Sequence, residues 1–145
     1  MTSVFIDTWG WINLFNVKED HYQDVSKLYK ELRNSRATIV TTDYILDEVF
    51  TLLFKRVPAE IAQKAIETIS AAIKRKYLTL TWITPERFDV SLNLRLKYKD
   101  KPKISFTDLT SMAVMQEFCI SHILTGDAHF THVGMGFVLV PSNRT

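Results

Sequence analysis

The alternation of apolar and polar positions divides the chain into short buried strands and amphipathic helices. Strands are predicted over SVFID (3–7), ATIVTT (37–42), YLTLTWI (77–83), ISHILTG (120–126) and GFVLV (136–140), because each is a short apolar run rich in strand-forming residues. Between these runs, apolar residues recur three and four positions apart, which is the period of a helix with one buried face. Helices are predicted over 8–15, 19–34, 43–54, 85–98 and 105–118, and a further helix is predicted to open at Pro58 and to include Ile73.

Several helices begin at recognisable capping residues. Thr84 and Pro85 form a pair of N-cap and first helical position, and a further helix opens at Pro58. The apolar stripe of the helix after Pro58 is expected to face a core, and it consists of Ile61, Ala65, Ile66, Ile69, Ala72 and Ile73. Strands that alternate with helices predict βαβ crossovers, and hence an α/β fold with a mostly parallel sheet between two layers of helices.

Size and composition favour one globular domain over residues 1–145. The chain is 46% hydrophobic and 23% charged, with only 4 Gly and 4 Pro, which excludes a linker, a repeat array or a disordered tail. No apolar run reaches the roughly 20 residues of a membrane span, and the N-terminus does not resemble a secretory signal. We therefore expect a soluble cytoplasmic protein, in which the single cysteine, Cys119, is a small core residue.

The net charge of +2 does not by itself indicate a nucleic-acid partner, but the basic residues are unevenly spread. Lys97, Lys99, Lys101 and Lys103 crowd into the segment LRLKYKDKPK. This segment is either a solvated helix end or a surface that contacts a polyanion. The second interpretation gains weight if the neighbouring residues form a site for phosphodiester chemistry.

Four acidic residues fall where parallel strands end or where the following helices begin. Asp7 closes the first strand, Asp127 follows the fourth, Asp108 lies in the first turn of a helix, and Glu48 lies in the helix after ATIVTT. Because active sites of parallel sheets form at the carboxyl ends of the strands, these four acids are expected to meet. Each of the three aspartates could instead be a helix cap or turn residue, and Glu48 could pair with a distant cation.

Glu48 has an internal control in its neighbour Asp47. On a helix, Glu48 shares a face with Ile45, Val49 and Leu52, whereas Asp47 shares one with polar residues. Glu48 is therefore expected to point inward and Asp47 to be solvated. Carboxylates that cluster repel one another unless a cation holds them, and oxygen ligands suit Mg²⁺ or Mn²⁺. The pattern thus predicts metal-assisted hydrolysis of a phosphodiester.

Four segments together resemble the PIN-domain ribonucleases, and in particular the VapC-type toxins of VapBC toxin-antitoxin pairs. They are FIDTWGWI with Asp7, TTDYILDEVFTLL with Glu48, SFTDLTSMAVMQE with Asp108, and ILTGDAHF with Asp127. The resemblance implies a PIN fold, Mg²⁺ or Mn²⁺ held by the four acids, and endonucleolytic cleavage of RNA. It also implies that Thr8 and Thr125 are hydroxyl donors that orient the acids, and that the chain forms a homodimer and binds an antitoxin.

The segment between Phe54 and Ser105 carries no motif of the family. Two functions other than that of a toxin also stay open. The chain could be a nuclease of RNA processing or decay outside any toxin-antitoxin pair, or a PIN module that binds RNA or protein without cutting. The histidines His21, His122, His129 and His132 are interpreted as polar surface residues, because an oxygen-only site already accounts for the acids.

Overall fold

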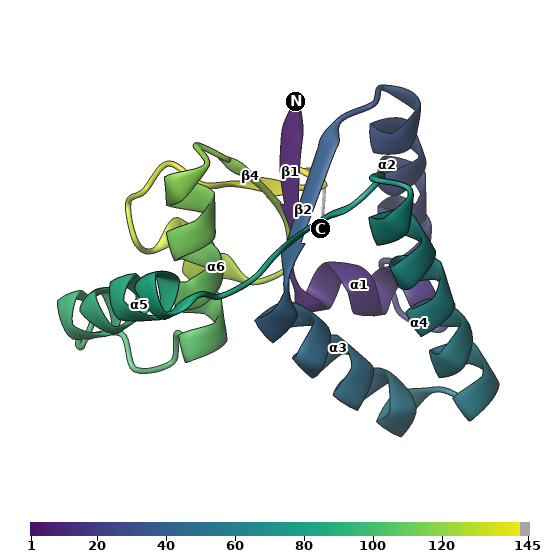
Figure 1. Cartoon of the computed structure of the whole chain (residues 1–145), viewed down its shortest axis with the longest axis horizontal. Helices are drawn as coiled ribbons and strands as arrows, with labels where there is room; N and C mark the ends of the chain where they lie inside the picture. Colours follow the sequence, from purple (N-terminus) through teal and green to yellow (C-terminus); the bar gives the residue numbers. More distant parts are fainter. Residues whose placement is uncertain (143–145) are drawn as a thin grey trace.

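One parallel sheet of five strands forms the centre of the computed structural model, which describes residues 1–142 (Figure 1). The strands are β1 (Ser3–Ile6), β2 (Thr38–Thr42), β3 (Thr79–Thr81), β4 (His122–Leu124) and β5 (Val138–Val140). Their order across the sheet is β3-β2-β1-β4-β5, and every neighbouring pair is parallel. The predicted α/β class with a parallel sheet is confirmed.

Six α-helices within the described residues cover the sheet. They are α1 (Thr8–Phe15), α2 (Tyr22–Asn34), α3 (Asp43–Arg56), α4 (Ala59–Lys74), α5 (Pro85–Lys97) and α6 (Phe106–Glu117), and a short 3₁₀ helix, η1, spans Ala128–Thr131. Helices α1 to α4 lie on one side of the sheet and α5 and α6 on the other, as the three-layer prediction requires (Figure 1). None of the helices in residues 1–142 combines the length and apolar character needed to cross a membrane.

Strand β1 is the buried middle of the sheet, and a polar link ties it to β2 and α1. Val4, Phe5 and Ile6 are almost completely buried. The hydroxyl of Thr41 in β2 donates to the carbonyl of Ile6 at 3.1 Å and accepts from the indole N–H of Trp11 in α1, also at 3.1 Å. Because all of these groups are buried and satisfied, the link fixes α1 against the ends of both strands.

Three local predictions are wrong, each for a geometric reason. Ile61 is 43% exposed because the first turn of α4 buries Ala62 instead. Only three residues of YLTLTWI form β3, an edge strand, and Trp82 beyond it is exposed. Cys119 is exposed because it follows the C-cap of α6 with a φ of 55°, which ends the helix and turns the side chain outward.

We expect Gly10→Ala to destabilise the protein, because Gly10 is where α1 packs on the sheet. A Cβ there would lie 2.7 Å from the Leu124 side chain and 2.8 Å from the Leu124 carbonyl oxygen, so the helix must shift. The expected loss in the free energy of unfolding is about 2 kcal/mol, measured by urea denaturation. Gly134→Ala is the control: its Cβ meets no atom within 4 Å, so only its φ of 66° adds a cost, about 1 kcal/mol. Equal losses in the two variants would contradict this account.

Candidate active site

A cavity of about 340 Å³ opens at the carboxyl ends of β1 and β4, and all four predicted acids line it. Its lining consists of Asp7, Thr8, Trp9, Ile12, Asn13, Glu19, Glu48, Leu52, Arg56, Asp108, Gly126 and Asp127. These residues come from the junction of β1 and α1, from α1, from the loop between α1 and α2, from α3, from the start of α6 and from the loop after β4. The topology therefore brings together acids that lie up to 120 positions apart in the chain.

Asp7 is the buried centre of this cavity, with only 5% of its surface exposed. One carboxylate oxygen accepts from the backbone N–H of Gly10 at 3.1 Å, and the other accepts from the hydroxyl of Thr125. Burial raises the pKa of Asp7 to about 7, and the nearby charges of Asp108 and Asp127 add to the rise, while the two hydrogen bonds oppose it. The group thus gains a proton near neutrality unless a cation replaces the proton.

Asp108 combines a helix cap with a place in the cavity. Its Oδ2 atom accepts from the backbone N–H of Ser105 at 3.4 Å, and the Ser105 hydroxyl accepts from the Asp108 N–H at 3.0 Å, so the capping box is formed. Burial raises the pKa of Asp108 to about 6, and repulsion from Asp127 adds to the rise. The Asp108 side chain therefore both caps α6 and lines the cavity.

Asp127 repeats this arrangement at the start of η1. Its Oδ1 atom accepts from the backbone N–H of His129 at 2.8 Å, and its own N–H donates to the hydroxyl of Thr125 at 3.0 Å. Thr125 therefore contacts both Asp7 and Asp127 and fixes the loop between them. The predicted orienting contact of Thr125 is present in the structure, and the role drawn from it stays a prediction.

Thr8 makes no such contact. Its hydroxyl oxygen is buried, lines the cavity, and has no hydrogen-bond partner among residues 1–142. A buried unsatisfied oxygen beside several carboxylates fits a site that takes a ligand, because buried polar atoms are normally paired. The oxygen-rich donor set suits Mg²⁺ or Mn²⁺.

His129, which was predicted to be a polar surface residue, lies beside the acids of the cavity. Its Nδ1 atom lies 3.1 Å from Asp127 Oδ1 and 3.6 Å from Asp108 Oδ2. Asp108, Asp127 and His129 each offer a ligand atom, and these atoms lie within 4.8 Å of one another. The sequence feature that could have identified His129 is its position two residues after Asp127, because a tight turn places such residues on the same side of the backbone.

Glu48 and Asp47 differ as their helix faces predict. Glu48 is half-buried and lines the cavity, whereas Asp47 is exposed. A cation also lines the cavity: Arg56, at the end of α3, lies 3.9 Å from Glu19. The pair is too exposed to contribute much to stability, but it places one positive charge at the rim of an otherwise acidic cavity.

The four lysines proposed to contact RNA do not line this cavity. Lys97, Lys99 and Lys103 are exposed, and Lys101 pairs with Asp100 at 3.0 Å. The loop that carries them is held by Arg95, whose guanidinium donates to the carbonyls of Tyr98, Lys101 and Ile104. The loop leads into the helix of Asp108, so contact with a long substrate stays a prediction.

Comparison with known proteins agrees with this geometry. Among solved structures, the chain is similar to VapC20 of Mycobacterium tuberculosis, described as a sarcin-ricin-loop cleaving toxin, with 26% identity, a TM-score of 0.75, and coverage of 93% of this chain and 96% of that one. It shares its fold with VapBC2 of Rickettsia felis, solved with a promoter DNA fragment, at 16% identity and a TM-score of 0.71, with 94% and 96% covered. A comparison with curated protein sequences gives no match. The PIN domain family profile matches residues 4–135, nearly the whole chain with all four acids inside it, and the protein therefore belongs to the PIN domain family.

Proposed function

We propose that the protein is a metal-dependent endoribonuclease of the cytoplasm and the toxin of a toxin-antitoxin pair. The observation that carries this proposal is the convergence of Asp7, Glu48, Asp108 and Asp127 around one cavity. Burial raises the pKa values of Asp7 and Asp108, and repulsion between the clustered carboxylates adds to the rise, so their charged forms are unfavourable without a cation. VapC20, to which the chain is similar, is described as a toxin that cleaves an RNA loop.

In this proposal the acids hold Mg²⁺ or Mn²⁺ beside a phosphodiester of RNA. When bound, the ion supplies an activated water and neutralises charge on the phosphate oxygens. Asp108 and Asp127 each use one oxygen for a cap, which leaves the second oxygen of each for a ligand. The ring of His129 faces both carboxylates, and the hydroxyl of Thr125 contacts both Asp7 and Asp127 and orients them.

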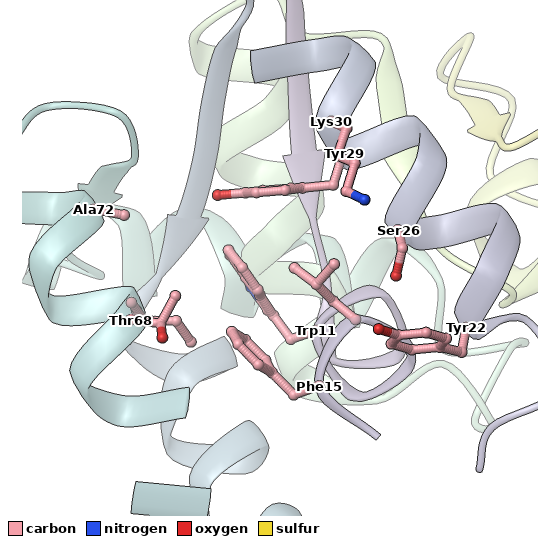
Figure 2. Close-up of a pocket in the computed structure, with 10 residues that line it drawn as sticks. Trp11, Phe15, Tyr22, Ser26, Tyr29, Lys30, Thr68 and Ala72 are labelled. Atoms are coloured by element: carbon pink, nitrogen blue, oxygen red, sulfur yellow. The ribbon is translucent and has the colours of Figure 1, made fainter. Parts of the chain in front are cut away.

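A second cavity, of about 260 Å³, supports an antitoxin as the partner (Figure 2). Aromatic side chains from α1 and α2 form its walls, with Trp11 and Phe15 stacked at 6.2 Å and Tyr29 close to Trp11. Lys30 and Thr68 lie at its rim (Figure 2). We propose that an amphipathic antitoxin segment inserts an apolar side chain here and places a carboxylate near Lys30.

The proposed assembly also includes a homodimer. Helix α5 exposes an apolar stripe of Phe88, Leu92 and Leu96 at four-residue spacing, and 68% of Leu96 is exposed. A second copy is the proposed cover for this stripe, because apolar stripes on helices are normally buried.

RNA cleavage is expected to require Mg²⁺ or Mn²⁺, to stop on addition of EDTA, and to fall at least a hundredfold in Asp7→Asn and Glu48→Gln. The measurement is the rate of appearance of fragments from a structured RNA. Asp47→Asn is the matched control for Glu48→Gln, because Asp47 is the exposed neighbour on the same helix, and it is expected to cut at the normal rate.

Measuring the stability of Asp7→Asn tests whether its loss of cleavage comes from unfolding. Folded Asp7 keeps its proton up to about pH 7, whereas the unfolded group loses it near 3.8, so burial of the charged form lowers stability as the pH rises between these values. The metal-free variant is therefore expected to be at least as stable as the wild type at pH 8. Full cleavage by Asp7→Asn would refute the assignment of this site.

The affinity for Mn²⁺ is expected to rise as the pH increases from about 5.5 to 7.5. Protons on Asp108 and Asp7, whose pKa values are about 6 and about 7, compete with the ion below this range. Calorimetry in buffers of different ionisation enthalpy measures both the affinity and the protons released. Asp7→Asn is expected to flatten the upper part of the rise, and an affinity independent of pH in the wild type would contradict the proposed ligands.

Thr68→Arg is expected to block the aromatic cavity and to weaken binding of the antitoxin at least tenfold, because a long side chain then occupies its rim. The partner to test is the product of the neighbouring reading frame, and the measurements are complex formation by gel filtration and inhibition of cleavage. Gln63→Arg, on the exposed face of α4, is the matched control and is expected to bind normally. Normal inhibition of Thr68→Arg would place the partner elsewhere, and a missing partner gene would favour a processing nuclease.

A further inference from the structure

A cavity lined by basic side chains lies at the amino ends of β2 and β3 and has a volume of about 610 Å³. Its lining is Arg33, Arg36, Ala37, Thr38, Ile39, Lys76, Tyr77 and Thr79. It forms where α2 passes into β2 and α4 passes into β3 (Figure 1). None of the acidic residues in 1–142 lines it, so its charge is opposite to that of the Asp7 cavity.

Two of these cations occupy the same position at the ends of their helices and line the same cavity. Arg36 and Lys76 each follow the C-cap of a helix, with φ values of 58° and 62°. The hydrogen bonds from Ala37 to Leu32 and from Tyr77 to Ala72 complete the same helix-ending motif in both places. Cys119 ends α6 in this way too, so the conformation alone is a helix stop. What α2 and α4 share is a basic residue at that position, beside one cavity.

These charges are available for a ligand. Within residues 1–142, Arg33, Arg36 and Lys76 have no carboxylate within ion-pair distance. The guanidinium of Arg33 lies over the ring of Tyr77, 3.9 Å from its centroid. This stacking orders the guanidinium while its N–H edge stays free to donate to phosphate oxygens. Lys74 and Arg75 directly precede Lys76 and add to the positive potential.

The position of the cavity limits the class of ligand. Strand β2 begins at Thr38, which lines the basic cavity, and ends at Thr42, which caps α3 at the acidic end. Five residues of strand span roughly 17 Å, so a mononucleotide cannot contact both cavities. A polyanion several nucleotides long can do so.

We propose that the cavity of Arg33, Arg36 and Lys76 binds the phosphodiester backbone of the substrate RNA, away from the bond that is cut. This proposal rests on the proposed ribonuclease function and adds a second contact to it. The cations would contact phosphates, and Tyr77, which is 49% exposed, would offer an aromatic side chain for stacking, which is the combination that single-stranded RNA sites use. Cations at helix ends also interact favourably with the helix dipole, but that role does not require a shared cavity.

The test is the double variant Arg36→Gly and Lys76→Gly. Glycine is the residue that the positive φ favours, so the two cations are removed without loss of folding, which thermal denaturation verifies. Binding of a fluorescent RNA of about 20 nucleotides is measured by anisotropy in EDTA, which prevents cleavage. The expected result is a Kd about tenfold higher and a salt dependence lower by roughly 1.4 in slope, or about 0.7 for each lost phosphate contact. Lys18→Gln with Lys64→Gln removes the same charge elsewhere and is expected to have little effect.

An unchanged Kd and salt slope in the glycine variant would overturn the proposal, as would an equal loss in the control variant or a wild type that fails to bind the RNA in EDTA. With metal present, an RNA of about 4 nucleotides, too short to reach the basic cavity, is expected to be cut by the glycine variant at the wild-type rate. Slower cutting of this short RNA would also count against the proposal. Binding is measured without metal and therefore does not depend on cleavage. If the glycine variant binds RNA more weakly but the wild type cuts no RNA with metal, only the ribonuclease function is refuted.

Discussion

The buried carboxylate of Asp7 is the interaction on which the rest of the molecule depends. It lies where β1 ends, and its two oxygens are bound by the N–H of Gly10 in α1 and by the hydroxyl of Thr125 after β4. The difference between an ordinary carboxyl group and one with a pKa of about 7 corresponds to roughly 4 kcal/mol between its charged and neutral forms. The fold therefore holds one acid in an unfavourable state, and neighbouring hydrogen bonds compensate only in part. The cation of the proposed function would remove that cost, so the fold and the proposed chemistry depend on the same buried carboxylate.

In this protein the same aspartates are both helix caps and residues of the candidate site. Asp7, Asp108 and Asp127 each accept a backbone N–H at the start of a helix, and each also faces the acidic cavity. The positive end of a helix offsets part of the repulsion between the carboxylates. Caps hold the side chains rigid before any ligand arrives, which is the preorganisation that metal sites need. The motifs are short because one residue at each helix start does both tasks.

The sequence predicted the position of a side chain correctly where that position depends on residues nearby in the chain. Glu48 and Asp47 could be separated because the face of α3 depends only on residues within two turns, and the strands could be located because their apolar runs are short and bounded. It was uninformative where the surroundings come from another element. The exposure of Ile61 depends on how α4 meets its neighbours, that of Cys119 on a backbone turn, and the contact of His129 with Asp108 on the packing of η1 beside α6.

The net charge of the chain does not indicate that acidic and basic side chains gather at opposite ends of the sheet. A balance of +2 is compatible with an acidic cavity at the carboxyl ends of the strands and a basic cavity at the amino ends, and the structure contains both. The parallel topology produces this polarity, because helix starts gather at one end, where acids are favoured, and helix ends gather at the other, where cations are favoured. If the proposed functions hold, a polyanion that approaches the carboxylates is repelled until a metal ion neutralises them, whereas the basic end attracts it with or without the ion. Under the two proposals, separating the basic cavity from the acidic cavity lets the acids stay clustered without excluding a long RNA.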